Sequence, residues 1–293
     1  MIQTNLTEGP LFKKMMAFAI PYLAACFLQT FYGMADLFIT GCFNGAVPVT
    51  AVSIGSQVMH MLTVMIVGLA MGSTISIGHA LGAKKKSAIS LYVGNTICLF
   101  PFLAIIFTAI LLFATDGIIA ILSTPVEAIA ETRKYLLLCF AGLPFIVAYN
   151  VIASIFRGLG DTKHPMYFVA CAGLINIVLD YILIGPYGMG AAGAAVATVL
   201  SEAISVLLAG LYLYHAPLGF TLSKKDLSPD WYPLRQLLHI GLPISFQDGL
   251  IQISFLIITI IANSRGVEVA AAVGIVEKVI GFLFLVPSAM LST

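Results

Sequence analysis

Four oxygen-bearing side chains stand out within otherwise apolar stretches of the sequence. Asn176 and Asp180 are four residues apart and therefore share one face of a helix. Asp36 and Thr198 lie in two other apolar stretches. Carboxylate, amide and hydroxyl oxygens brought together can hold a proton or a hard cation such as Na⁺. These residues predict a site for H⁺ or Na⁺, and their types suit either ion.

The depth of these residues supports one shared site. At 1.5 Å per helical residue, Asp36 and Asp180 lie roughly 8 Å and 6 Å from the nearer ends of their stretches, and Asn176 and Thr198 roughly 13 Å. The tract "GMGAAGAA" (188–195) has almost no side chains, so the helices on either side can pack backbone to backbone. We therefore expect Thr198 to approach Asn176 and Asp180. The alternative is a hydrogen-bonded polar pair that only joins helices.

Further polar residues share helix faces with this predicted site. Tyr32 and Gln29 precede Asp36 by four and seven residues, and Glu202 follows Thr198 by four. Burial and a neighbouring carboxylate both favour the protonated form of an aspartate. We expect at least one aspartate of the site to be protonated, or to share a cation, at neutral pH.

The composition places these residues in a membrane. Of the 293 residues, 60% are hydrophobic and 9% are charged, and the mean hydropathy is +1.05. A soluble domain carries about 25% charged residues. The protein is therefore expected to be integral to a lipid bilayer. The net charge of +1 gives no basis for a nucleic-acid partner, and the five cysteines have no metal-binding spacing, so no cofactor is expected.

Eight apolar runs are long enough to cross a bilayer, which takes about 20 residues each. Backbone groups in lipid must be paired within their own segment, so the runs predict helices and an all-α integral membrane bundle. Their approximate ranges are 15–41, 50–78, 88–113, 134–156, 165–184, 189–213, 237–262 and 270–293.

Lysine and arginine residues predict the orientation. Few of them lie on one side of the membrane, namely Arg133, Lys134 and Arg265. Many lie on the other side: Lys13, Lys14, Lys84, Lys85, Lys86, Arg157, Lys163, Lys224, Lys225 and Arg235. By the positive-inside rule the second side is cytoplasmic. We expect a multi-pass protein with its N-terminus in the cytoplasm.

The sequence also contains an internal repeat. "AIPYLAACFLQ" from Ala19 is similar to "GLPISFQDGLIQ" from Gly241, and two shorter pairs of segments follow in the same order. A repeat separated by six spans predicts two parallel halves, as in transporters. We expect a first six-helix lobe (1–214), a cytoplasmic connector (215–236) and two helices of a second lobe (237–293). If the second lobe copies the first, on the order of 140 further residues would complete it.

The motifs resemble a known family. The relevant segments are "AIPYLAACFLQTFYGMADLFITG", "GLAMGSTISIGHALGAKKK", "SIFRGLGDTKHPM", "NIVLDYILIGPYGMGAAGAAVAT" and "GLPISFQDGLIQIS". Together they resemble the multidrug and toxic compound extrusion (MATE) transporters, in particular the prokaryotic branch. The resemblance implies twelve helices in two lobes. It also implies antiport of amphipathic, cationic compounds against H⁺ or Na⁺ across a prokaryotic cytoplasmic membrane, by a monomer that is not an enzyme.

The resemblance implies a cation site in the first lobe. An aspartate on the first helix, Asn and Asp on the fifth and a threonine on the sixth form it in the family. By motif these residues are Asp36, Asn176, Asp180 and Thr198. The candidate network around them consists of Gln29, Tyr32, Tyr135, Asn150 and Glu202. Another branch uses a glutamate on the seventh helix, which "GLPISFQDGLIQ" lacks, so we do not expect coupling through that residue.

Two other functions fit the sequence less well than efflux does. "GLGD" (158–161) is similar to the GxGD motif of intramembrane aspartyl proteases, but it lies in a predicted loop. There Asp161 is expected to pair with Arg157 or Lys163. A lipid-linked-sugar flippase of the same superfold would need several cations for its phosphates. Apart from Lys278 in the eighth run, the spans contain no embedded cation, which favours efflux of cationic compounds.

Overall fold

The protein is helical throughout the part of the chain that the structure describes. The computed structural model describes residues 10–215, 220, 222–223, 226–264, 276, 280, 283 and 284. Within them lie seven α-helices and a 3₁₀ turn, η1 (Val126–Ala128). The helices are α1 (Leu11–Phe43), α2 (Ala46–Gly82), α3 (Lys86–Ile121), α4 (Ile129–Gly158), α5 (Lys163–Ile184), α6 (Gly190–His215) and α7 (Trp231–Ser264). The predicted all-α membrane fold is confirmed. Most of the predicted eighth run, including Lys278, and also Lys224, Lys225 and Arg265 lie outside the described residues.

The helices are longer than the apolar runs that predicted them. Each of the seven is long and apolar enough to cross a membrane. The run 88–113 lies within α3, which continues to Ile121 because no proline occurs between residue 113 and Pro125. Hydropathy identifies the apolar residues needed to cross the bilayer, but a helix can extend beyond them at either end.

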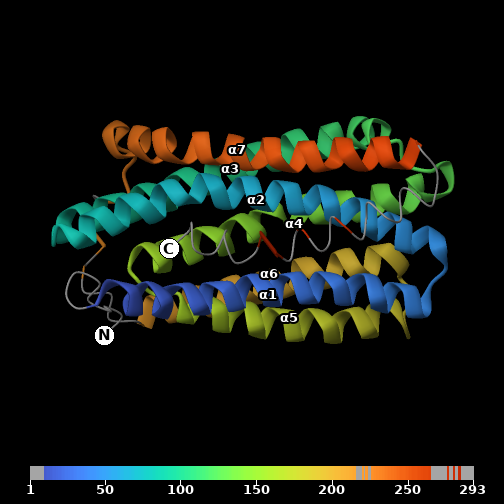
Figure 1. The fold of residues 1–293 in the computed structure, drawn as a ribbon, viewed down its shortest axis with the longest axis horizontal. Coiled ribbons are helices and arrows are strands. Elements are labelled where there is room, and N and C mark those ends of the chain that lie inside the picture. The colour runs from blue at the N-terminus through green and yellow to red at the C-terminus, as the bar shows by residue number, and fades with distance from the viewer. Residues whose placement is uncertain are drawn as a thin grey trace.

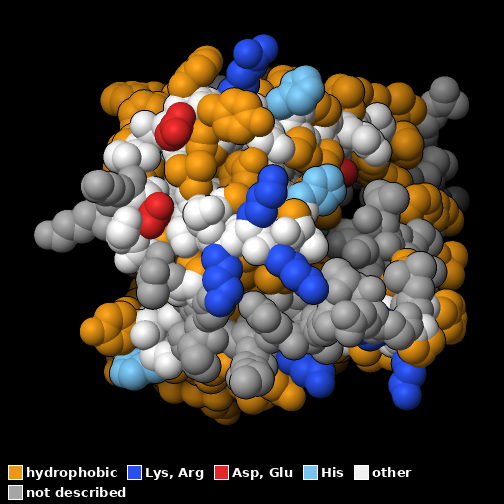
Figure 2. All heavy atoms as spheres, turned by 90° about the vertical axis from the view of Figure 1, so that its left-hand side faces the viewer, with side chains coloured by type: hydrophobic (Ala, Val, Ile, Leu, Met, Phe, Trp, Pro, Cys, Tyr) orange, Lys and Arg blue, Asp and Glu red, His pale blue; other side chains and the backbone are white. Residues whose placement is uncertain are grey.

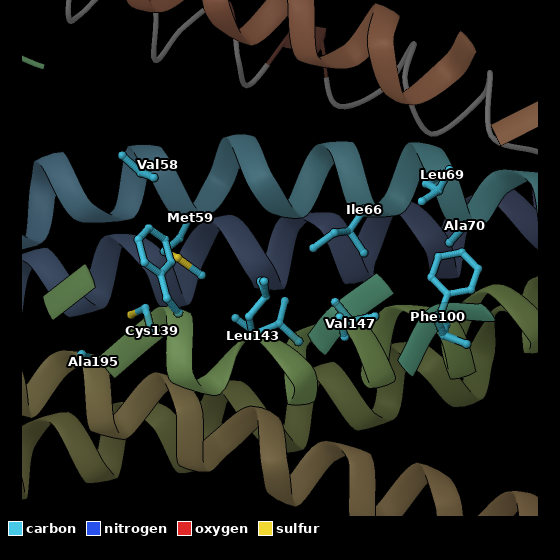
Figure 3. Packing of buried hydrophobic residues seen from close by; sticks show 14 of the residues in the cluster. Val58, Met59, Ile66, Leu69, Ala70, Phe100, Cys139, Leu143, Val147 and Ala195 are labelled. Carbon is cyan, nitrogen blue, oxygen red and sulfur yellow. The ribbon is translucent and has the colours of Figure 1, made fainter. Parts of the chain in front are cut away.

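The helices form a bundle of roughly parallel rods (Figure 1). α2 and α4 occupy the middle, with α1, α5 and α6 on one side and α3 and α7 on the other. Figure 3 shows the central packing, in which Met59 and Ile66 of α2 lie near Leu143 and Val147 of α4. Large apolar side chains such as Phe113 point outward, as lipid requires.

One end of the bundle carries most of the described basic residues. α1 begins there and α2 ends there, and Figure 2 shows lysine and arginine side chains spread over this face. Lys84, Lys85, Lys86, Lys163 and Arg235 are exposed on it. We call it the basic end. The positive-inside rule predicts that it faces the cytoplasm.

Glycines bring α2 and α7 together backbone to backbone. A Cβ added to Gly72 would lie 2.1 Å from the Leu237 carbonyl oxygen, and one added to Gly241 would lie 2.3 Å from the Leu69 carbonyl oxygen. Small residues permit such close approach between membrane helices. Thus α7, assigned by sequence to the second lobe, packs closely on a helix of the first. The division into lobes at 214 and 237 stays a prediction.

The end of the connector is fixed on the first lobe. The backbone N–H of Asp230 donates to Asn95 Oδ1 at 2.8 Å, and the Tyr92 hydroxyl donates to Gln236 Oε1 at 2.6 Å. Gly94 makes room for this, since a Cβ there would lie 1.9 Å from the Asp226 carbonyl oxygen. α7 therefore starts from a fixed position against α3.

The loop between α4 and α5 differs from its prediction. Asp161 is buried and does not pair with the side chain of Arg157 or Lys163. Its Oδ1 instead accepts the backbone N–H groups of Lys163 (3.1 Å) and His164 (3.2 Å), and its Oδ2 pairs with the His164 ring. Gly160 turns the chain with φ of +83°, which directs Asp161 toward the free amides at the start of α5.

Asp161→Ala should therefore destabilise the protein by about 1 kcal/mol, the usual effect of losing a helix cap. Asp161→Asn keeps the Oδ1 acceptor and should lose less than half as much. Thermal unfolding of the detergent-solubilised protein would measure both. Equal losses would mean that the carboxylate–His164 contact, rather than the cap, stabilises this loop.

Candidate functional site

The four residues singled out first lie together inside the bundle. Asp36 from α1, Asn176 and Asp180 from α5, and Thr198 from α6 are close enough for their side chains to interact. Asp36 is 6% exposed, Asn176 1% and Asp180 0%. We call these four residues the acid cluster. The sequence predicted this grouping.

The acid cluster has unsatisfied polar atoms. Five polar atoms are buried without a hydrogen-bond partner of good geometry in the described part of the chain: Asp36 Oδ1, both Asp180 carboxyl oxygens and both polar atoms of the Asn176 amide. Such atoms are rare in folded proteins, and each one is destabilising. Carboxylate and amide oxygens in such an arrangement can accept a proton or a cation. Among the described residues no three His, Cys, Asp or Glu side chains group as a metal site, and the cluster itself contains two carboxylates and neutral oxygens.

Local structure orients the cluster. The Thr198 hydroxyl donates to the Ala194 carbonyl at 3.0 Å, so its oxygen lone pairs remain available to a ligand. The Thr40 hydroxyl donates in the same way to the Asp36 carbonyl at 2.7 Å. Both bonds run back one turn within their own helix. They hold the hydroxyl protons away from the carboxylates.

Two of the five predicted network residues, Tyr32 and Tyr135, lie near the acid cluster, and a third, Glu202, lies near Tyr32. Tyr135 of α4 is 2% exposed and lies within electrostatic range of Asp36 and Asp180. Its ring is fixed by Gly55, where a Cβ would come within 2.2 Å of it. Tyr32 lies within the same range of both Asp36 and Glu202. The Oε2 atom of Glu202 is buried and has no hydrogen-bond partner among the described residues.

The other two network residues line a separate cavity. Gln29 of α1 and Asn150 of α4 border a space of about 40 Å³ nearer the basic end. The Asn150 side chain donates to its own helix, at the Ile146 carbonyl (2.8 Å). Gln29 and Asn150 of the predicted network therefore lie at this cavity rather than in the acid cluster.

Two buried or half-buried charged residues are not among the site residues predicted from the sequence. The sequence places Arg157 among the loop cations, but it is the second-last residue of α4 and only 8% exposed. The sequence indicates the burial of Arg157 by its position directly after an apolar run, with no polar residue between Ser154 and Arg157. Asp248 lies in the apolar run of α7, half-buried against Gly68 of α2. The sequence indicates a functional role for Asp248 because a carboxylate lies inside a predicted span.

Comparisons with known proteins agree with this architecture. The model of the MatE family matches residues 21–182. "Probable multidrug resistance protein YpnP" of Bacillus subtilis is 28% identical over 275 residues, which cover 94% of this chain and 61% of that protein. "Multidrug export protein MepA" of Staphylococcus aureus is 25% identical over 281 residues, 94% of this chain and 61% of MepA. The chain thus spans about three-fifths of the length of these relatives.

A solved structure shows the same fold. It is described as the outward-facing conformation of a multidrug resistance MATE family transporter of the MOP superfamily. The TM-score is 0.87 at 25% sequence identity, over 96% of this chain and 62% of the solved one.

Proposed function

The chain belongs to the MatE family, and we propose that the protein exports amphipathic, cationic compounds by antiport against H⁺ or Na⁺. The families and structures that it resembles are transporters rather than enzymes. The observation that supports coupling is the acid cluster, in which Asp36 and Asp180 face each other with unpartnered oxygens. Two carboxylates cannot both remain charged at such a place, so the binding of one proton or one cation is favoured.

The cluster couples ion binding to helix position. It joins α1, α5 and α6, so filling or emptying it changes the repulsion between α1 and α5. A ligand shifts a conformational equilibrium only as far as it binds one state better than another. A cation or proton between Asp36 and Asp180 stabilises the state in which α1 lies against α5. We propose that substrate is bound and released as this contact tightens and loosens.

We further propose the predicted arrangement in the membrane. Residues 1–214 form the first lobe, 215–236 the cytoplasmic connector and 237–293 the start of the second lobe. The protein lies in the cytoplasmic membrane of a prokaryote as a monomer with its N-terminus inside. The exposed basic end supports this orientation (Figure 2).

Export can be tested in a drug-hypersensitive bacterium. Expression of the protein from its own gene should raise resistance to several unrelated cationic dyes and lower their accumulation, because an apolar passage with acidic groups favours such compounds. Cells with the empty vector are the control. Unchanged dye accumulation, with the protein confirmed in the membrane, would contradict the proposed export.

A further inference from the structure

Two aromatic side chains project outward at the start of α7. Trp231 is 74% exposed and Tyr232 is 72% exposed, and Trp231 is the sole tryptophan of the sequence. They lie at the basic end, where α7 begins beside α3 (Figure 1). The predicted apolar run of α7 begins at position 237, so at 1.5 Å per residue both rings lie about 8–9 Å outside it. This is close to the depth of the lipid headgroups, where tryptophan and tyrosine are enriched.

An exposed cation lies on the same face of α7. Arg235 follows Trp231 by one helical turn, and it belongs to no ion pair among the described residues. It lies about 3 Å outside the apolar run, from where an arginine side chain can extend to the phosphates of the lipid. A guanidinium binds phosphate oxygens through parallel hydrogen bonds. We call Trp231, Tyr232 and Arg235 the α7 patch.

The acidic residues just before the α7 patch are engaged by the chain itself. Asp230 Oδ1 accepts the backbone N–H of Tyr232 at 3.1 Å, which caps the start of α7. Asp226 Oδ2 accepts the backbone N–H of Ser223 at 2.8 Å and the hydroxyl of the same residue at 2.7 Å. Neither carboxylate pairs with Arg235 in the described part of the chain, so this guanidinium can bind an anion from outside.

The α7 patch has a fixed support. The backbone N–H of Asp230 donates to Asn95 Oδ1, and the side chain of Gln236 accepts the Tyr92 hydroxyl. These two bonds attach α7 to α3 on either side of the patch. A surface that is already ordered loses little conformational freedom when it binds a ligand. The attachment of the connector to α3 therefore prepares the patch for binding.

Three further cations lie farther from the apolar run. Lys84, Lys85 and Lys86, in the turn between α2 and α3, are exposed, and none forms an ion pair among the described residues. Lys86 precedes Asn95 by nine residues, so this turn lies about 13 Å beyond the support of the patch. The Debye length is about 8 Å at physiological salt and about 30 Å at 0.01 M. The lysines therefore act on the patch mainly at low salt, whereas Arg235 acts by contact.

The surface around Arg235 favours a lipid over a free phosphate ion. The same face of α7 continues through His239 into the exposed apolar side chains of Leu242 and Phe246, which suit acyl chains. The charge of the patch then selects among lipids. A zwitterionic headgroup carries an ammonium group, for which the patch offers no carboxylate. An anionic headgroup has no such group to repel the guanidinium of Arg235.

We propose that the α7 patch binds the headgroup of an anionic phospholipid in the leaflet at the basic end. Arg235 contacts the phosphate, and Trp231 and Tyr232 lie beside the headgroup. The site is separate from the acid cluster, on the opposite side of α2 from α1 and α5. It does not depend on export, and its test needs no transport.

Trp231 is a built-in reporter because no other tryptophan contributes to the fluorescence. The purified protein is placed in vesicles of equal parts phosphatidylcholine and phosphatidylglycerol, and one lipid or the other carries bromine, which quenches tryptophan, near the headgroup end of its acyl chains. One cation close to an anionic surface corresponds to roughly a fivefold preference. At physiological salt we therefore expect a preference of about fivefold for phosphatidylglycerol, seen as stronger quenching by its brominated form. At low salt the preference should increase.

Three variants separate contact from general charge. Arg235→Gln should lower the preference at physiological salt to less than about twofold. Replacing Lys84, Lys85 and Lys86 together by glutamine should keep that preference and remove its increase at low salt. Lys163→Gln is the matched control, because Lys163 is exposed at the basic end but lies on α5, across the bundle from α7 (Figure 1). If Arg235→Gln does not fold, the comparison of lipids on the unsubstituted protein still decides the question.

Four outcomes would overturn the proposal. Equal quenching by the two brominated lipids would mean that the patch does not select anionic headgroups. No quenching by either would mean that another part of the protein covers Trp231. A preference that disappears when inorganic phosphate is added at constant ionic strength would identify a site for the free ion. An equal loss in the Lys163→Gln variant would assign the preference to the whole basic end.

Discussion

Asp36→Asn and Asp180→Asn are each expected to abolish ion-driven efflux, with at least a tenfold loss of rate. Asparagine has nearly the shape of aspartate but neither takes up a proton nor carries a negative charge. With one carboxylate left, the mutual repulsion that favours ion binding is gone. Both variants should still insert and retain some dye binding, because the change keeps the volume of the buried side chain.

Dye efflux from proteoliposomes, driven by an imposed proton or sodium gradient, would measure the effect and identify the coupling ion. Asp116→Asn is the matched control, since this aspartate is exposed, pairs with Arg133 and does not belong to the acid cluster. Glu202→Gln should reduce efflux less than either aspartate change, because Glu202 lies one turn away from the cluster. Wild-type rates in both aspartate variants would show that the cluster only joins helices.

Gly72→Ala should strongly disrupt the packing of α2 against α7. The new Cβ would lie 2.1 Å from the Leu237 carbonyl oxygen, which is backbone and cannot rotate away. Overpacking typically destabilises by about 1–3 kcal/mol. We expect the upper part of that range or more here, since one helix must move away from the other along a contact that also includes Gly241.

Denaturation of the purified protein in mixed micelles would measure the loss of stability. Gly117→Ala is the matched control, because a Cβ at Gly117 of α3 meets nothing within 4 Å. That variant should be as stable as the wild type or slightly more so. A Gly72→Ala protein as stable as the Gly117→Ala protein would mean that α7 does not pack closely on α2 in the membrane.

The sequence predicted the helices and the acid cluster for simple reasons. Lipid excludes unpaired backbone groups, so hydropathy alone finds membrane helices. Helical periodicity places Asn176 and Asp180 on one face, and the small residues before Thr198 allow α6 to pack against α5. Depth then limits which polar residues can meet. These arguments need only helix geometry, and they were sufficient to place Asp36 with the other three.

The cavity and the loop could not be predicted in the same way. Gln29 shares a helix face with Asp36, but seven residues separate them by about 10 Å along the axis, so Gln29 lies beside a different neighbour. The burial of Arg157 depends on Tyr22 of α1, whose ring covers the guanidinium, and its position directly after an apolar run indicates this only indirectly. For Asp161, opposite charge suggested Arg157 or Lys163, whereas the free amides of α5 were closer donors.

The backbone contact between α2 and α7 also concerns the order in which the protein is made. Gly72 and its partner Gly241 are separated by 169 positions (241 − 72). At about 5–20 residues per second, a ribosome needs roughly 10–30 s to pass from one to the other. During that interval α2 is already synthesised but its glycine face has no partner. The first lobe therefore passes through a nascent state in which this face of α2 is not covered by α7. The packing of α7 onto α2 is a late step of biogenesis.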